Sequence, residues 1–220
     1  MIRCLSCFQI YDENYGVCPH CGAYDVKAKQ PIHLTPGTKL LNRYLIGQEI
    51  GAGGFGIIYK AWDTKLDCIV AIKEYFPSRL CFRAEGTRDV IVNGKSKEEF
   101  DYRKTRFLVE ARNMAKFGSN KNIPNVYEFF EDNNTAYIVM ELLIGETLSE
   151  YMHKFGSIDI SIATFIAGEI ANALEALHAN GIIHRDVAPD NVFICTEKEI
   201  KVKIKDKEET IIDIGFLIAI

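Results

Sequence analysis

The 220-residue sequence predicts an α+β protein in which an antiparallel sheet comes first, a helical part follows, and a small metal-binding unit precedes both. Segments rich in β-branched and aromatic residues flank short polar or glycine-rich turns, which is typical of β-hairpins. Two longer segments place apolar residues at helical spacing. Together these patterns predict a cysteine-rich unit at 1–26, a linker at 27–40 and the main domain at 41–220.

The N-terminal unit has the cysteine spacing of a zinc ribbon. Cys4 and Cys7 form one C-x-x-C pair, and Cys18 and Cys21 form a second pair ten residues later. Four thiolates complete the tetrahedral coordination of a structural Zn²⁺. Two disulfides or unmetallated thiols are the alternative, but the other three cysteines are isolated, as expected in a reducing compartment. We therefore expect one zinc ion in this unit and a cytoplasmic location.

Charge argues against a nucleic-acid-binding role. The whole chain has a net charge of −4, and 48% of its residues are hydrophobic, which suffices for a core. Residues 1–29 carry three basic and three acidic side chains and no basic stripe that would grip phosphates. We therefore expect the ribbon to have a structural or protein-binding role and expect no nucleic-acid partner.

A glycine-rich stretch lies between two strand-like segments, 44–50 and 56–62. Its sequence is Gly51-Ala52-Gly53-Gly54-Phe55-Gly56-Ile57-Ile58. A dinucleotide-binding loop would open a helix, whereas the residues after this stretch are β-branched and aromatic. The pattern therefore predicts a β-hairpin whose backbone N–H groups cover phosphates.

A lysine and a helix come after this hairpin. Lys73 ends the apolar run Ile69-Val70-Ala71-Ile72, so we expect its stem to be enclosed and its ammonium to face a partner, although most lysines are simply on the surface. Residues 95–117 lack Pro and Gly and have helical spacing. Between them, 74–96 reads as a loop or small hairpin.

Further elements are expected downstream. Residues 126–130 and 136–141 flank a polar turn and predict a second hairpin, and 147–154 predict a short helix. An amphipathic helix is expected from 159 to 180, between an N-terminal Asp159 and Gly181. It leads into His184, which we expect to be a structural histidine. Strand-like residues at 192–195 and 210–212 flank a charged arm, 197–205.

The octet His184-Arg185-Asp186-Val187-Ala188-Pro189-Asp190-Asn191 carries the strongest chemical signal. Phosphoryl transfer needs a carboxylate that takes the hydroxyl proton and an amide oxygen that binds Mg²⁺, and Asp186 and Asn191 fit these roles. With the glycine-rich stretch, Val-Ala-Ile-Lys73 and Asp213-Ile214-Gly215, the chain from about residue 40 onward resembles a eukaryotic-type serine/threonine protein kinase of the kind found in bacteria.

The resemblance implies a kinase-like first lobe, an ATP–Mg²⁺ site and a protein substrate. It assigns catalysis to Asp186, Lys73 and Asn191, and magnesium to Asn191 and Asp213. Lys73 would pair with a helix glutamate; Glu110 is favoured over Glu98 and Glu99, which lie in the first turn. Met140 would lie behind the adenine, and 141–143 would form the hinge. The implied nucleotide-binding positions are Gly51, Gly53, Gly56, Ile58, Ala71, Lys73, Glu110, Met140, Glu141, Leu143, Asn191 and Asp213.

Three departures from the kinase pattern leave a second interpretation open. Ile214 replaces the usual Phe, and Ala188 stands where many such kinases have Lys. The sequence stops five residues after Gly215, so we expect an incomplete, truncated helical lobe. The alternative is therefore an inactive nucleotide-binding pseudokinase or a zinc-bearing interaction module. The final apolar run, 216–220, is too short to span a membrane, and we expect no such span.

Overall fold

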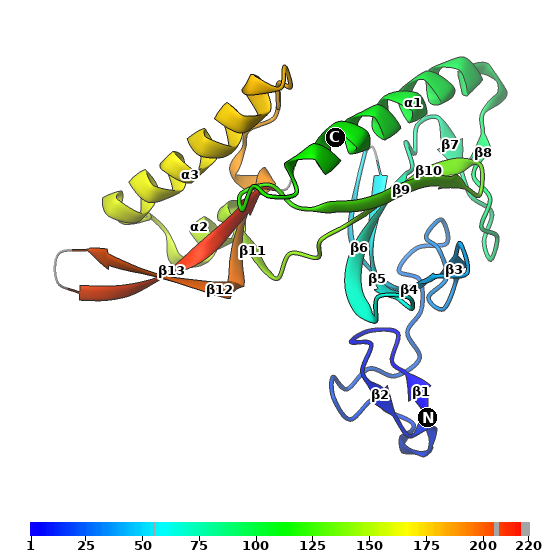
Figure 1. Cartoon of the computed structure of the whole chain (residues 1–220). Helices are drawn as coiled ribbons and strands as arrows, with labels where there is room; N and C mark the ends of the chain where they lie inside the picture. The colour runs from blue at the N-terminus through cyan, green and yellow to red at the C-terminus, as the bar shows by residue number, and fades with distance from the viewer. Residues whose placement is uncertain (55, 205–206, 217–220) are drawn as a thin grey trace. The chain divides into compact units, whose positions relative to one another are not determined.

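The structure is a computed structural model that describes residues 1–54, 56–204 and 207–216, with side chains described up to Cys195. The chain forms two compact units (Figure 1). The first comprises residues 1–113 and 126–142, and the second comprises residues 114–125 and 143–220. The α+β class expected from the sequence is confirmed.

A six-stranded sheet in which all neighbouring strands are antiparallel forms the centre of the first unit, in the order β3-β4-β5-β6-β10-β9. The glycine-rich hairpin and the second hairpin are both present as predicted. The strands are β3 (Lys39–Leu40), β4 (Tyr44–Gly53), β5 (Gly56–Asp63), β6 (Cys68–Tyr75), β9 (Val126–Asp132) and β10 (Thr135–Met140).

Helix α1 (Lys97–Met114) packs on the first unit's sheet (Figure 1). The ring of Tyr75, at the end of β6, lies 5.0 Å from that of Phe100 and 5.4 Å from that of Phe107. A turn of 3₁₀ helix, Ala115–Phe117, continues α1. The helix expected at 95–117 is therefore confirmed, and aromatic contacts fix it to the strand that carries Lys73.

The 74–96 segment contains a small hairpin. Strands β7 (Cys81–Phe82) and β8 (Ile91–Val92) pair antiparallel. The Val90 N–H donates to the Asn133 carbonyl at 2.9 Å, which connects this hairpin to the turn between β9 and β10. The sequence expectation of a loop or small hairpin is confirmed.

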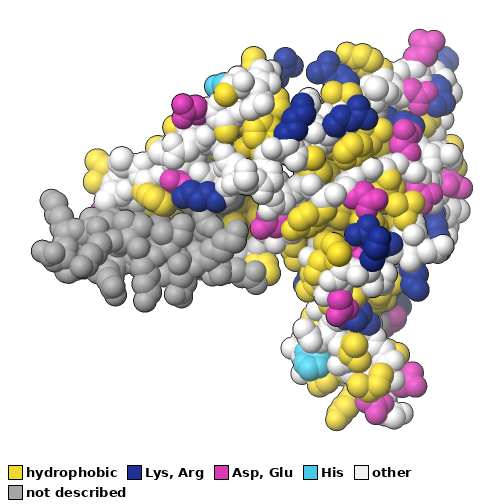
Figure 2. All heavy atoms as spheres, viewed as in Figure 1, with side chains coloured by type: hydrophobic (Ala, Val, Ile, Leu, Met, Phe, Trp, Pro, Cys, Tyr) yellow, Lys and Arg dark blue, Asp and Glu magenta, His cyan; other side chains and the backbone are white. Residues whose placement is uncertain are grey.

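The N-terminal ribbon belongs to the first unit. It contains β1 (Ile2–Arg3), paired with β2 (Ile10–Tyr11), and a 3₁₀ turn, Glu13–Tyr15. Figure 2 shows apolar and acidic side chains on the visible face of the ribbon. The domain boundaries at 26 and 40 remain predictions.

The described part of the second unit contains two α-helices and a three-stranded antiparallel sheet. Thr147 caps α2 (Leu148–Phe155) through a reciprocal contact with Glu150, and Asp159 caps α3 (Ile160–Ala179) by accepting from the Ser161 N–H at 2.8 Å. Both helices were expected. The strands are β11 (Gly145–Thr147), β12 (Val192–Ile204) and β13 (Lys207–Phe216), with a 3₁₀ turn at Pro189–Asn191.

The expectation of a charged arm separating two short strands was wrong. The backbone of 197–204 continues β12, and Ile204 pairs with Lys207 in β13. Its sequence alternates charged and β-branched residues from Glu199 to Ile204, which is a strand pattern despite the high charge. The high charge of this segment therefore led to the wrong prediction of an arm that separates two strands.

Helix α3 is long and apolar enough to be a membrane candidate by length and composition, with a mean hydropathy of 1.4, and 17% of its apolar stretch is buried. One such helix is weak evidence of a membrane span. Its Glu169 pairs with the Lys121 ammonium at 2.7 Å and accepts from the Asn122 amide at 2.9 Å. These polar contacts fit a helix that packs within a protein, and the expectation of no span remains a prediction.

Candidate functional site

One face of the first unit's sheet gathers four of the positions implied for the nucleotide. Ile58 of β5 lies directly opposite Lys73 of β6, and Ala71 lies opposite Met140 of β10. Residues directly opposite in an antiparallel sheet point to the same face, and so do residues two apart in one strand. Ile58, Ala71, Lys73 and Met140 therefore line a common surface, which is the surface that Tyr75 shares with α1.

Lys73 lies in a poorly hydrated environment. The loss of water lowers the pKa of its ammonium to about 8, and the Glu110 carboxylate opposes this by favouring the charged form. Glu99 instead pairs with Arg103 at 2.7 Å, one helical turn along. The structure thus relates Lys73 to Glu110, the acid that the sequence favoured, and its role toward a nucleotide remains a prediction.

The glycine-rich turn between β4 and β5 has two kinds of glycine. A Cβ at Gly56 would lie 2.5 Å from the Glu74 carbonyl oxygen, so only glycine allows β5 to approach β6 at this point. A Cβ at Gly53 or Gly54 would meet no described atom within 4 Å. These two glycines therefore leave the turn's backbone accessible to a ligand. Phe55 lies outside the described residues.

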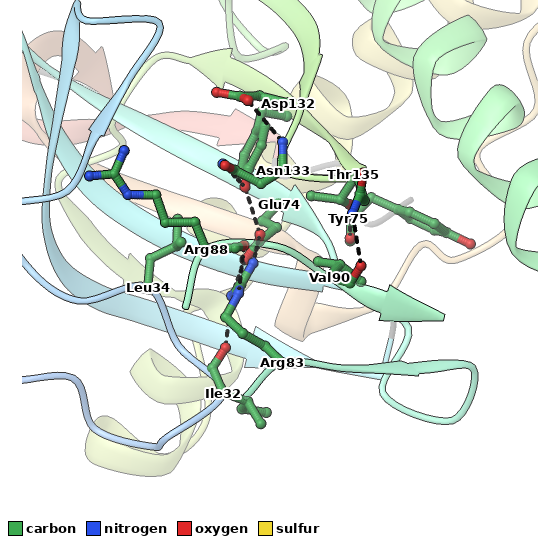
Figure 3. A network of polar contacts seen from close by, with 12 residues as sticks. Ile32, Leu34, Glu74, Tyr75, Arg83, Arg88, Val90, Asp132, Asn133 and Thr135 are labelled. Atoms are coloured by element: carbon green, nitrogen blue, oxygen red, sulfur yellow. Dashed lines mark hydrogen bonds and ion pairs between the residues drawn. The ribbon is translucent and has the colours of Figure 1, made fainter. Parts of the chain in front are cut away.

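The opposite face of the sheet is held by a buried ion pair that sequence reasoning missed. Glu74, next to Lys73, pairs with Arg83 of the 74–96 hairpin, and both side chains are fully buried. Glu74 also accepts from the Tyr59 hydroxyl at 3.0 Å and the Tyr137 hydroxyl at 2.9 Å. Figure 3 shows Arg83 extending the network to the carbonyl of Ile32, which accepts from the guanidinium at 2.7 Å.

This polar network ties two other segments to the lysine-bearing strand. Arg83 connects the 74–96 hairpin to Glu74 of β6, and its bond to the Ile32 carbonyl connects the segment that follows the ribbon. The Leu34 N–H donates to the Tyr59 hydroxyl at 3.0 Å. A charged residue at a core-facing strand position is the sequence signal that could have found Glu74, because a buried carboxylate requires a partner. Its partner could not be identified from local sequence.

The predicted hinge follows β10. Met140, the last residue of β10, is half-buried, and so are Glu141, Leu142 and Leu143 after it. Residues 141–144 have no regular secondary structure before β11 begins at Gly145. The role of residues 141–143 toward adenine remains a prediction.

The second unit carries the His-Arg-Asp segment. The Asn191 side-chain amide donates to both the carboxylate and the backbone carbonyl of Asp186, each at 2.9 Å. The amide nitrogen makes both of these contacts, so the Asn191 amide oxygen, the atom expected to bind Mg²⁺, takes no part in them. Arg185 has a left-handed backbone, with φ of 66°, immediately before the exposed Asp186. The structure thus brings the predicted base and metal ligand together.

His184 has the structural role expected of it. It is buried, and its Nδ1 accepts from the Asp186 N–H at 3.3 Å. Burial lowers the pKa of its imidazole and thus favours the neutral form that can accept this bond. Asp213 lies in β13, where its backbone is opposite Cys195, but its side chain lies outside the described residues. Its predicted magnesium role therefore stays a prediction.

The four ribbon cysteines form a cluster suited to a metal. Their Sγ atoms all lie within 4.8 Å of one another, with Cys4–Cys21 and Cys7–Cys18 at 3.7 Å. A tetrahedral Zn²⁺ with bonds of about 2.3 Å to sulfur would hold pairs of sulfurs about 3.8 Å apart. The backbone N–H of Ala23 lowers the pKa of the Cys21 thiol to about 7, which supplies a thiolate at neutral pH. The donor set and its spacing therefore fit zinc.

The chain resembles known protein kinases in sequence. The protein kinase domain family matches residues 44–207. A probable serine/threonine-protein kinase of Clostridium acetobutylicum is 39% identical over 166 residues, which cover 76% of this chain and 22% of that protein. The probable serine/threonine-protein kinase PknB of Lactococcus lactis is 34% identical over 167 residues, covering 76% and 24%. The chain thus spans less than a quarter of the length of these relatives.

Two solved structures extend the resemblance to the fold. The apo form of PpkA-294 has 31% sequence identity and a TM-score of 0.69, covering 74% of this chain and 58% of that one. Rad53 1-466 in complex with AMP-PNP has 25% identity and a TM-score of 0.54, covering 70% and 35%.

Proposed function

Because the chain belongs to the protein kinase family, we propose that it transfers the γ-phosphoryl group of ATP to a serine or threonine hydroxyl of a protein. The observation that carries the proposal is the Asp186–Asn191 pair, in which a carboxylate and an amide are bonded at 2.9 Å within the His-Arg-Asp segment. The kinase names of the relatives and the AMP-PNP bound to Rad53 support the same chemistry.

Each residue has a definite role in this proposal. The Lys73 ammonium neutralises phosphate charge, and Glu110 keeps that lysine charged and oriented. Asp186 accepts the proton of the attacking hydroxyl, and the Asn191 amide holds its carboxylate in place. Asn191 and Asp213 would hold Mg²⁺, which neutralises charge on the transferring phosphoryl group when bound. The backbone around Gly53 and Gly54 would cover the phosphates.

Labelled ATP tests the proposal directly. The full chain, incubated with Mg²⁺, γ-labelled ATP and a library of serine and threonine peptides, is expected to transfer label to the hydroxyls, and EDTA is expected to abolish transfer. Ala188 favours a second candidate, a pseudokinase, because a cation near the transferring phosphate contributes several kcal/mol in a typical site. Nucleotide binding without any Mg²⁺-dependent transfer would select the pseudokinase.

We also propose that the ribbon binds one structural Zn²⁺ through Cys4, Cys7, Cys18 and Cys21. Metal analysis of the purified protein should give about one zinc per chain, because four thiolates complete the coordination. Replacing Cys4 and Cys7 together by serine is expected to remove the metal, whereas Cys68→Ser should retain it. An unchanged zinc content in the double variant would reject the assignment.

The partners and the location rest on the same chemistry. We propose a protein as the phosphoryl acceptor and no nucleic-acid partner, since the ribbon has no excess of basic residues. None of the seven cysteines, all of which lie in the described part of the chain, forms a disulfide, which supports a reducing, cytoplasmic location.

A further inference from the structure

Each C-x-x-C pair and the residue after it form a tight turn, here called a knuckle: the first is Cys4–Phe8 and the second is Cys18–Gly22. The first knuckle packs against β4, the strand that leads into the glycine-rich turn. A Cβ at Gly47 would lie 2.5 Å from the Leu5 carbonyl oxygen and 2.6 Å from the ring of Phe8. The Ser6 hydroxyl donates to the Gln48 side-chain oxygen at 3.2 Å. Leu5 and Ser6 are the two residues between the ligands Cys4 and Cys7, so the metal-binding turn itself makes the contact.

Phe8 has an unfavourable backbone conformation, which its packing against the sheet must compensate. It has a left-handed backbone, with φ of 62°, which a bulky residue adopts only when its surroundings impose it. The second knuckle has Gly22, with φ of 72°, at the equivalent position. Both residues donate their N–H four residues back, to the carbonyls of Cys4 at 3.0 Å and Cys18 at 2.8 Å. The first knuckle therefore carries an aromatic ring where the turn itself favours glycine.

The Phe8 ring has a clear reason to be there. Phe8 is 1% exposed, and its ring centroid lies 6.0 Å from that of Trp62, at the far end of β5. The Arg3 guanidinium lies 3.9 Å from the centroid of the Trp62 ring and donates to the Phe8 carbonyl at 2.7 Å. The ribbon thus contacts both strands of the glycine-rich hairpin, β4 at Gly47 and β5 at Trp62.

The corresponding residues of the second knuckle are exposed and do not pack as Leu5 and Phe8 do. Its two intervening residues, Pro19 and His20, are exposed, as is Gly22. The two halves of the cysteine cluster have the same turn geometry but different surroundings. The first half is therefore specialised for contact with the sheet, and the second half provides a matched internal control.

The contact lies where the hairpin's register is set. The pairing of β4 with β5 shifts between Ile46 and Glu49, the interval that contains the contacted residues Gly47 and Gln48, and shifts again between Glu49 and Gly51. Such irregularities bend a strand and change the direction of its next residues. Gly51, the first glycine of the turn, lies four residues beyond Gly47.

We propose that the zinc-loaded first knuckle positions the glycine-rich turn, so that zinc strengthens nucleotide binding. Phe8 and Gly47 are the positioning residues, and neither is a metal ligand or a nucleotide contact. The inference rests on the proposed nucleotide site and the proposed zinc site. Because linkage is reciprocal, nucleotide must strengthen zinc binding by the same factor, and couplings of this kind typically span about 5- to 150-fold.

The test measures the dissociation constant of Mg²⁺–ADP for the full chain, zinc-loaded and after zinc removal by a chelator that is then dialysed away. The wild type is expected to bind the nucleotide at least about fivefold more weakly without zinc. Phe8→Gly suits the left-handed turn and removes the ring, so it should retain zinc but show one nucleotide affinity in both states. Gly47→Ala disturbs the contact from the sheet side and should do the same. His20→Ala, in the exposed knuckle, should behave as the wild type.

A second measurement needs no nucleotide. Backbone amides of residues 44–62 are expected to exchange with deuterium more slowly when zinc is bound to the wild type, and to show no such difference in Phe8→Gly. If the wild type binds zinc and nucleotide, but its nucleotide affinity and amide exchange are the same with and without zinc, the proposed coupling alone is overturned. A wild type that holds no zinc, or binds no nucleotide, would instead overturn the corresponding proposed site and the coupling with it.

Discussion

Replacing Arg83 by methionine is expected to reduce the free energy of unfolding of the first unit by about 3–5 kcal/mol, because it leaves a buried carboxylate without its cation. Arg83 and Glu74 are both fully buried and pair directly. The same change removes the bonds from the guanidinium to the carbonyls of Ile32, at 2.7 Å, and Arg88, at 2.9 Å. Denaturant unfolding followed by a probe in the first unit measures the effect.

Two controls separate burial from charge in this experiment. Lys97 pairs with Asp101 on the exposed side of α1, so Lys97→Met should cost less than about 1 kcal/mol. Adding Glu74→Gln to Arg83→Met should recover part of the loss, since a neutral amide is cheaper to bury than an unpaired carboxylate. If Arg83→Met costs no more than Lys97→Met, the buried pair does not hold the hairpin and the linker to β6.

The second large effect is expected at the proposed base. Asp186→Asn should reduce phosphoryl transfer by about 10²- to 10⁴-fold, because general base catalysis contributes that much and an amide cannot accept the hydroxyl proton. Nucleotide affinity should change little, because the substitution keeps the size of the side chain and Asn191 can still bond to the carbonyl of residue 186 at 2.9 Å. Initial rates of label incorporation at saturating ATP measure it.

A carboxylate elsewhere in the same unit provides the comparison. Glu175 is exposed on α3, and Glu175→Gln should leave the rate unchanged. Equal rates for Asp186→Asn and the wild type would show that another group takes the proton.

Local pattern predicted the elements of this fold well, since hairpins and amphipathic helices are encoded in residues close in sequence. The glycine-rich hairpin and α3, with its Asp159 cap, were identified in this way. The 197–205 arm was misjudged because its charge concealed a strand alternation. Asp186 and Asn191 are five residues apart, so their pairing too was accessible from sequence.

The supports behind the site could not be predicted, because they join distant segments. Glu74 contacts Arg83 and Tyr137, which are 9 and 63 residues away, and nothing in the local sequence of any of them names the others. The same holds for Gly47, whose missing side chain is explained only by the ribbon residues Leu5 and Phe8. Tertiary packing decides which residues occupy these supporting positions, whereas the sequence motifs reveal only the functional groups that the supporting residues hold.

Nucleotide affinity measured across pH, for the wild type and for Lys73→Met, tests the central claim that Lys73 binds phosphate. Its pKa of about 8 means that the ammonium is charged at neutral pH and loses its proton as the pH rises through 8. Phosphate binding favours the charged form, so wild-type affinity should be steady below about pH 7 and fall by up to tenfold per pH unit above 8. Lys73→Met should bind more weakly and show no such fall. Equal affinities and equal pH profiles in the two proteins would contradict the account.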